Sequence, residues 1–238
     1  MKTNSTPRLT VRLANDRGHA NHGWLNSHHT FSFADYFDPR HTGFRSLRVI
    51  NDDRVAPGGG FPTHPHRDME IFSYVLEGKL QHQDSMGNGR ILGPGEIQLM
   101  GAGRGVRHSE YNPSPTDSAH FLQIWIEPHT RGLEPRYTEW KPASGPAAAK
   151  TLVISPDGRD SSAVIFQDAE VFLLRPRVGE SVTHEVKPGR GIWLHAARGQ
   201  FTVNGVPLRE GDAVSTEEAG ELEITGEAGS EGLLFDLA

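Results

Sequence analysis

Short apolar segments separated by turn residues constrain this chain more than any other feature. Clusters such as Pro57-Gly58-Gly59-Gly60 and Gly93-Pro94-Gly95 interrupt the sequence at close intervals. The 27 Gly and 16 Pro make up about 18% of the 238 residues, whereas their average combined share is about 12%. Glycine and proline at this density are typical of tight turns between strands. No long helical crossover is required, so the sequence predicts an all-β fold.

The turn pattern divides the chain into two β-rich halves. We expect a first domain over residues 1–130, a linker over 131–150 that is poor in periodic apolar residues, and a second domain over 151–238. The expected strands of the first half are 44–51, 71–76, 79–84, 95–100, 108–111 and 120–127; those of the second are 151–154, 163–166, 170–175, 181–186, 191–196, 200–204 and 222–225.

A weak internal repeat relates the two halves. Residues 74–99 contain strand, Gly78, strand, tight turn, and then Gly95 opening another strand. Residues 195–215 repeat this order around Gly199 and Gly211, with a shorter hairpin. Self-similarity of this kind is typical of duplicated structural units. The sequence therefore predicts two stacked copies of one β-barrel-like unit.

Composition excludes several functional classes. With 24 basic and 30 acidic residues the net charge is −6, which does not resemble the one-sided basic surface of a nucleic-acid or membrane binder. The absence of cysteine rules out disulfides, thiolate metal sites and cysteine nucleophiles. The first ten residues, MKTNSTPRLT, contain no apolar run of the signal-peptide type. We expect a cytoplasmic monomer with no direct nucleic-acid or membrane partner.

Histidine is the unusual residue, with 13 in the chain. His64-Pro65-His66 and His108-Ser109-Glu110 each place two potential metal ligands at positions i and i+2, which share one face of a strand. If the two segments meet, three imidazoles and one carboxylate converge. Such a set suits one divalent ion of iron, manganese, cobalt, nickel, copper or zinc. The alternative is that the pairs arise by chance in a histidine-rich chain.

The remaining histidines and aromatic residues have ordinary explanations. We expect no second metal among the histidines of the amino-terminal stretch. His82 either lines a pocket near the metal or is exposed on a hairpin. Phe121 and Trp125 alternate with other residues on a strand and are expected in the core. The histidines of the amino-terminal stretch are His19, His22, His28, His29 and His41.

Specific motifs then identify a family. The spacing from Gly58 through His64, His66 and Glu70 to Gly78 resembles the first motif of the cupin superfamily, and Gly103 through His108 to Asn112 resembles the second. More narrowly, the segments HPHRDMEIFSYVLEG, HQDSMGN, RHSEYNPS, HHTFSFADYFDP and LLFDL resemble bacterial proteins of the pirin family, in particular the pirin-like quercetin 2,3-dioxygenases. The resemblance runs from about residue 8 to the end.

The resemblance implies a bicupin, that is, two double-stranded β-helix (jelly-roll) barrels, with a metal only in the first. It implies that the metal is Fe(II) and that the ligands are His64, His66, His108 and Glu110. Glu70 is a ligand in many cupins; here we expect it to accept a hydrogen bond from a ligand imidazole or to be a satisfied structural carboxylate. In the second half His184 stands alone, so we expect it to be packed or hydrogen-bonded.

The resemblance also implies an activity. A flavonol, or another enol or phenol, would bind with O2; its 3-hydroxyl would lose a proton to Glu110 or to a bound water, and ring opening would release carbon monoxide. A second hypothesis is a metal-dependent, redox-responsive regulatory protein with only incidental flavonol cleavage. A third is a cupin that isomerises a sugar or small acid.

Overall fold

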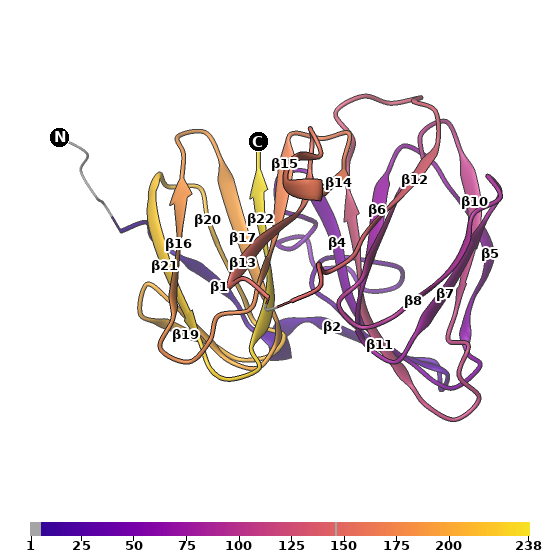
Figure 1. Ribbon diagram of the computed structural model, residues 1–238, viewed down its shortest axis with the longest axis horizontal. Helices are drawn as coiled ribbons and strands as arrows, with labels where there is room; N and C mark the ends of the chain where they lie inside the picture. Colours follow the sequence, from indigo (N-terminus) through magenta and orange to yellow (C-terminus); the bar gives the residue numbers. More distant parts are fainter. Residues whose placement is uncertain (1–5, 146) are drawn as a thin grey trace. The chain divides into compact units, whose positions relative to one another are not determined.

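The computed structural model describes residues 6–145 and 147–238, and these form an almost entirely β chain, which confirms the predicted fold class. The chain divides into two compact units (Figure 1). The amino-terminal unit contains residues 17–142 and 163–167. The carboxy-terminal unit contains the rest of the described chain. Among the described residues, no helix has the length and apolarity needed to cross a bilayer.

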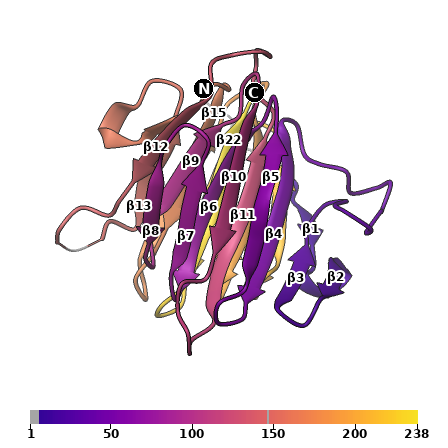
Figure 2. The same cartoon turned by 90° about the vertical axis from the view of Figure 1, so that its right-hand side faces the viewer.

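Two sheets form the amino-terminal unit, and Figure 1 shows them facing each other. The larger has seven strands in the order β12 (Arg136–Trp140), β9 (Ile97–Gly101), β6 (Glu70–Glu77), β11 (Ala119–Ile126), β4 (Leu47–Val55), β3 (Leu25–His29) and β2 (Gly18–Asn21). The smaller has four, in the order β5 (Gly60–His66), β10 (Val106–Tyr111), β7 (Leu80–Asp84) and β8 (Gly89–Leu92). The smaller sheet lies toward the viewer in Figure 2.

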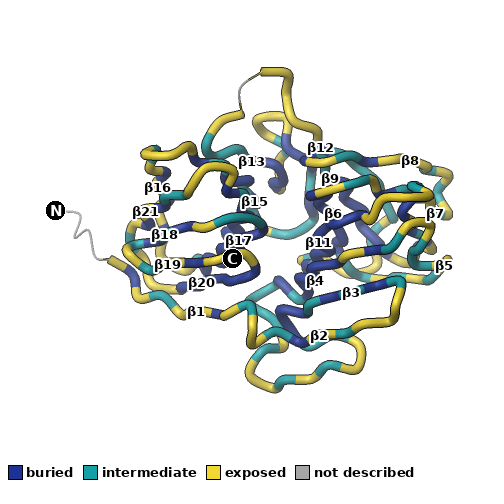
Figure 3. Tube along the Cα trace, turned by 90° about the horizontal axis from the view of Figure 1, so that it is seen from below, coloured by how far each residue is buried: buried dark blue, intermediate teal, exposed yellow. Residues whose placement is uncertain are grey.

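Apolar side chains fill one end of the space between these sheets. Val75, Leu80 and Phe121 belong to a cluster of buried residues contributed by both sheets. The central strands of the larger sheet are buried along nearly their whole length, whereas the loops are exposed (Figure 3). A second apolar cluster contains Ile71, Met100 and Val106. Burial of these apolar surfaces stabilises the barrel.

The carboxy-terminal unit repeats this architecture. Its larger sheet contains, in order, β1 (Thr10–Arg12), β20 (Ala213–Thr216), β17 (Gly191–Arg198), β22 (Glu231–Leu237), β15 (Ala169–Leu174) and β13 (Lys150–Ser155). Its four-stranded sheet has the order β16 (Ser181–Val186), β21 (Gly220–Gly226), β18 (Phe201–Val203) and β19 (Val206–Leu208). The chain also has β14 (Ala163–Val164) and the 3-10 turns η1 (Ala14–Asp16) and η2 (Arg159–Ser161).

Several boundaries differ from the sequence-based expectation. The expected linker 131–150 contains β12, which pairs with β9 and so belongs to the amino-terminal unit. Thr10–Arg12 were expected in the first domain, but they form β1, which pairs with β20 of the carboxy-terminal unit. The strand expected at 44–51 continues to Val55. Asp52 and Asp53 look like turn residues in the sequence, but both are buried inside the strand.

Candidate metal centre

Strands β5 and β10 place the candidate ligands opposite one another. The two strands are antiparallel, and His108 is the register partner of His64. Close approach requires Gly60, where an added Cβ would contact Glu110 O and would lie 2.6 Å from Tyr111 Cα. The pairing of these strands therefore brings the two histidine-containing segments into contact, as the sequence interpretation requires.

The three predicted histidines form a compact cluster. One ring nitrogen each from His64, His66 and His108 lies within 4.8 Å of the other two. The ring centroids are 4.5 Å apart for His64 and His108, 4.7 Å for His64 and His66, and 4.8 Å for His66 and His108. Burial lowers the pKa of His66 to about 4 and that of His108 to about 2, so both imidazoles are neutral at pH 7. Neutral imidazole is the form that binds metal ions.

A hydrogen-bonded chain behind His108 defines which of its nitrogens faces the cluster. Asp84 is an acceptor, so Nε2–H of His82 donates to Oδ2 of Asp84 across 3.3 Å. Burial lowers the pKa of His82, and the neutral ring then has its lone pair on Nδ1. Nδ1–H of His108 therefore donates to Nδ1 of His82 across 3.5 Å. This leaves the Nε2 lone pair of His108 directed into the cluster.

A hydrogen bond at Nδ1 also fixes which nitrogen of His64 faces the cluster. Its Nδ1–H donates to the carbonyl oxygen of Pro62 across 2.8 Å, so its Nε2 also carries a lone pair. The Nε2 atoms of His64 and His108 are 3.0 Å apart. Two nitrogens bound at about 2.1 Å to one ion at a right angle are separated by about 3.0 Å. Two lone pairs that face each other at this distance fit a shared cation.

Glu110 is not part of this three-histidine group, but its restrained carboxylate lies within 4.8 Å of a ligand atom of His108. Its Oε1 accepts hydrogen bonds from Ser73 Oγ at 2.9 Å and Gln98 Nε2 at 2.7 Å, and its Oε2 accepts one from Gln123 Nε2 at 3.1 Å. A carboxylate has about four acceptor sites, so one remains on Oε2. Burial raises the pKa of Glu110 to about 7 despite these bonds. The three donors are neutral and carry no charge that would offset that of the buried carboxylate. A nearby cation would lower the pKa of Glu110 and favour its ionised form.

A second grouping overlaps the first. Ligand atoms of His82, His108 and Glu110 also lie within 4.8 Å of one another. His82 is fully buried and stacks on the ring of Tyr137, with centroids 5.1 Å apart. The exposed hairpin position expected for His82 is therefore wrong, and the residue lies behind His108 rather than in the lining of the cavity that His64 and His66 border.

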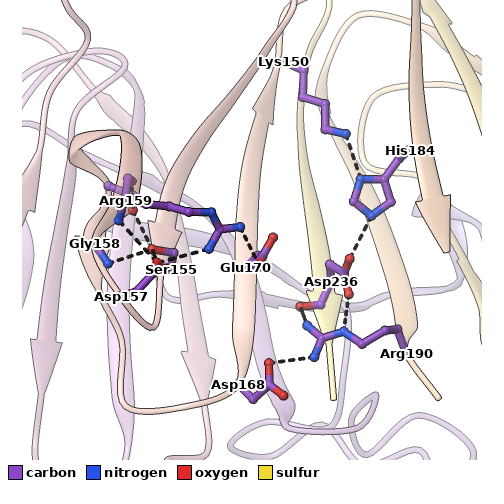
Figure 4. Close-up of polar contacts among 11 residues, drawn as sticks. Lys150, Ser155, Asp157, Gly158, Arg159, Asp168, Glu170, His184, Arg190 and Asp236 are labelled. Carbon is purple, nitrogen blue, oxygen red and sulfur yellow. Dashed lines mark hydrogen bonds and ion pairs between the residues drawn. The ribbon is translucent and has the colours of Figure 1, made fainter. Parts of the chain in front are cut away.

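Glu70 and His184 have structural partners. The carboxylate of Glu70 accepts hydrogen bonds from Arg136 Nη2 at 2.8 Å and from the Phe166 N–H at 3.3 Å, as a satisfied structural carboxylate does. In the carboxy-terminal unit, His184 Nε2 lies 3.0 Å from Asp236 Oδ2, and its Nδ1 lies 2.9 Å from Lys150 Nζ (Figure 4). The hydrogen bonding expected for His184 is thus observed.

A cavity of about 560 Å³ adjoins the histidine cluster, a size within the usual range for small-molecule sites. Both His64 and His66 line it, together with aromatic side chains. Trp125, expected in the core, is one of these. Sequence reasoning also missed the polar residues of the interior, although the polar triplet Asn51-Asp52-Asp53 inside an apolar strand was a signal that could have found some of them.

Comparisons with known proteins agree with this fold. Residues 10–126 match the family model described as Pirin, and residues 152–237 match the one described as Quercetinase C-terminal cupin domain. The chain is 48% identical over 229 residues to a protein of Escherichia coli named quercetin 2,3-dioxygenase, covering 96% of this chain and 98% of that protein. It is 39% identical to a pirin-like protein of Caulobacter vibrioides, covering 93% and 96% of the two chains.

Solved structures give the same assignment. The crystal structure of the bacterial pirin YhhW from Escherichia coli in complex with nickel(II) superimposes with a TM-score of 0.89 at 47% identity, covering 97% of this chain and 99% of that one. On the evidence of its two matched domains, its relatives and its architecture, the chain belongs to the pirin family of the cupin superfamily.

Proposed function

We propose that this protein is a metal-dependent dioxygenase that cleaves flavonols of the quercetin type. The observation that carries the proposal is the convergence of His64, His66 and His108, the first two of which line a cavity with aromatic walls. The relative named quercetin 2,3-dioxygenase, at 48% identity over nearly the whole chain, supports the same reaction class.

The proposed cofactor is one divalent ion, Fe(II), held by the three histidines and Glu110. Three neutral imidazoles and one carboxylate around a dication leave a net charge of about +1 and about two open positions in octahedral geometry. When bound, the ion would supply Lewis acidity toward an enolate oxygen and reactivity with O2. Zinc, manganese, cobalt, nickel and copper suit the same ligands, and a relative has been crystallised with nickel(II).

The side chains of the site have distinct proposed roles. The aromatic walls bind the flat rings of the flavonol. The proton of the substrate 3-hydroxyl passes to a bound water or to Glu110, whose carboxylate is held by Ser73, Gln98 and Gln123. The resulting enolate reacts with O2, the central ring opens, and carbon monoxide leaves. Quercetin and O2 together account for every atom of the depside and of carbon monoxide, so no external reductant is needed.

The test is anaerobic reconstitution with Fe(II), followed by addition of O2 and measurement of quercetin loss together with carbon monoxide. We expect one carbon monoxide per quercetin consumed. His108→Ala should bring turnover down to that of free Fe(II), whereas His129→Ala, at an exposed histidine of the same unit that does not line the cavity, should retain it.

Two results would contradict the proposal. Full turnover in His108→Ala would refute the site. Tight metal binding without turnover in the wild-type protein would refute the dioxygenase and favour the regulatory hypothesis, in which the state of the metal controls binding to a partner protein.

A further inference from the structure

The cavity beside the histidine cluster has flat aromatic walls. Trp125 contacts the ring of His66 edge-on, with centroids 4.8 Å apart, and Phe33 contacts Trp125 in the same way at 5.4 Å. Trp24 and Phe61 also line the cavity and pack edge to face at 5.2 Å. Such walls bind a planar aromatic ligand by shape and apolar contact. They do not by themselves distinguish one hydroxylation pattern from another.

A row of polar side chains leads from the candidate ligand Glu110 into this cavity. Gln123, which donates to Glu110, is the register partner of Asn51 on the neighbouring strand β4. Asn51 is in turn the partner of His29 on β3. Register partners in antiparallel strands share one face of the sheet, and Asp53 shares that face with Asn51 because it lies two residues further. All four side chains line the cavity.

Three of these side chains have buried polar atoms without a partner. Within the described parts of the chain, Oδ1 of Asn51, Oδ1 of Asp53 and Nδ1 of His29 make no hydrogen bond. Both Asn51 and Asp53 are at least 97% buried as residues. Buried polar atoms are nearly always paired in folded proteins, so unpaired acceptors at a cavity wall indicate a partner supplied from the cavity.

The charge state of the row fits an uncharged ligand group. Burial raises the pKa of Asp53 to about 7, an effect that a hydrogen bond from the Ser27 hydroxyl to the carboxyl opposes and that the carboxylates of Asp52 and Glu110 increase. Burial lowers the pKa of His29 to about 4, so its ring is neutral at pH 7. No fixed positive charge therefore lies in this row, and Asp53 can accept or, when protonated, donate a hydrogen bond. A phenolic hydroxyl, which can do both, fits it.

We propose that Asn51 and Asp53 form a hydroxyl-binding subsite that recognises a phenolic hydroxyl of the substrate other than the one directed at the metal. A phenolic O–H donates to Oδ1 of Asn51 or to the carboxyl oxygen of Asp53 and supplies the missing partner. The inference rests on the proposed function and extends it, because it selects polyhydroxylated flavonols among planar aromatic ligands. The two residues determine specificity by contacting the ligand directly.

The test compares two flavonols in the nickel-loaded full chain under nitrogen, where binding is measured without turnover. Quercetin carries several phenolic hydroxyls; 3-hydroxyflavone has the 3-hydroxyl and no other. We expect wild-type protein to bind quercetin at least about tenfold more tightly, as one buried hydrogen bond implies. In Asn51→Leu and Asp53→Leu, which keep side-chain size and remove the acceptors, the preference should fall to about threefold or less.

The control is Ser46→Ala, which removes another buried, unpartnered oxygen that lies outside the cavity lining and should leave the preference unchanged. If a leucine variant does not fold, Asn51→Ala and Asp53→Ala serve in its place. A wild-type preference that persists in the variants would refute the subsite, as would equal binding of the two flavonols by the wild-type protein.

Turnover assays on the same proteins separate the two proposals. Carbon monoxide release by the wild-type protein without any preference for quercetin would leave the dioxygenase standing and refute the subsite. A preference that depends on Asn51 and Asp53, without carbon monoxide release, would support the subsite and refute the dioxygenase.

Discussion

Replacing His82 tests the hydrogen-bonded chain that orients the metal-binding nitrogen of His108. His82→Phe keeps an aromatic ring stacked on Tyr137 but removes the acceptor for Nδ1–H of His108 and the link to Asp84. His108 would then be free to rotate or to change tautomer. Loss of such a partner behind a metal-bound histidine typically weakens metal affinity 10–100-fold, which corresponds to about 1.4–2.7 kcal/mol.

Competition with a chromophoric chelator measures this affinity directly, and the absorption spectrum of the Co²⁺-loaded protein reports the ligand set. Tyr137→Phe is the matched control, since it keeps the ring against His82 and removes only the hydroxyl that donates to Glu139. We expect the control to bind metal like the wild-type protein. An affinity within twofold of wild type in His82→Phe would refute the orienting role. A loss far beyond 100-fold with a changed Co²⁺ spectrum would show that His82 is itself a ligand.

Three further changes test the fold of the two units. Asp52→Asn should cost about 3 kcal/mol of unfolding free energy at pH 7, because it leaves Arg17 and His120 buried without their carboxylate. Burial alone would raise the pKa of Asp52, but His120 and Arg17 hold this pKa well below its usual range. The ionised carboxylate therefore stabilises the fold above about pH 4, and this contribution is lost as the pH falls. In urea titrations, the difference in unfolding free energy between wild type and variant should therefore shrink in acid. Gly60→Ala should destabilise by about 1–3 kcal/mol and weaken metal binding, because the added Cβ contacts β10 at Glu110; unchanged metal affinity would contradict the close packing of β5 and β10. Asp236→Ala should cost about 3–5 kcal/mol by leaving Arg190 without its buried partner, with no effect on metal affinity, and equilibrium unfolding together with chelator competition measures both.

The paired histidines could be predicted because their geometry is local. The two-residue period of a strand places His108 and Glu110 on one face, and the structure shows both buried on β10. A register shift between these residues in the pairing with β5 does not alter the alternation within β10 itself. The all-β fold was predictable for the same reason, since turn residues act over a few positions.

The partners of the site could not be found in this way. Ser73, Gln98 and Gln123 come from three strands, and they meet at Glu110 only through the order β9-β6-β11 in the larger sheet. Strand order and register are non-local and leave no periodic signal in the sequence. β12 was missed because its residues are mostly half-buried at a sheet edge, which gives no apolar alternation.

A crystal structure of the metal-loaded protein, with anomalous diffraction recorded at the metal absorption edge, tests the proposed ligand set. We expect one peak, about 2.0–2.2 Å from Nε2 of His64, Nε2 of His108, a ring nitrogen of His66 and Oε2 of Glu110. A peak coordinated by His82 in place of His64 and His66, or a Glu110 carboxylate more than about 3 Å from the ion, would contradict it.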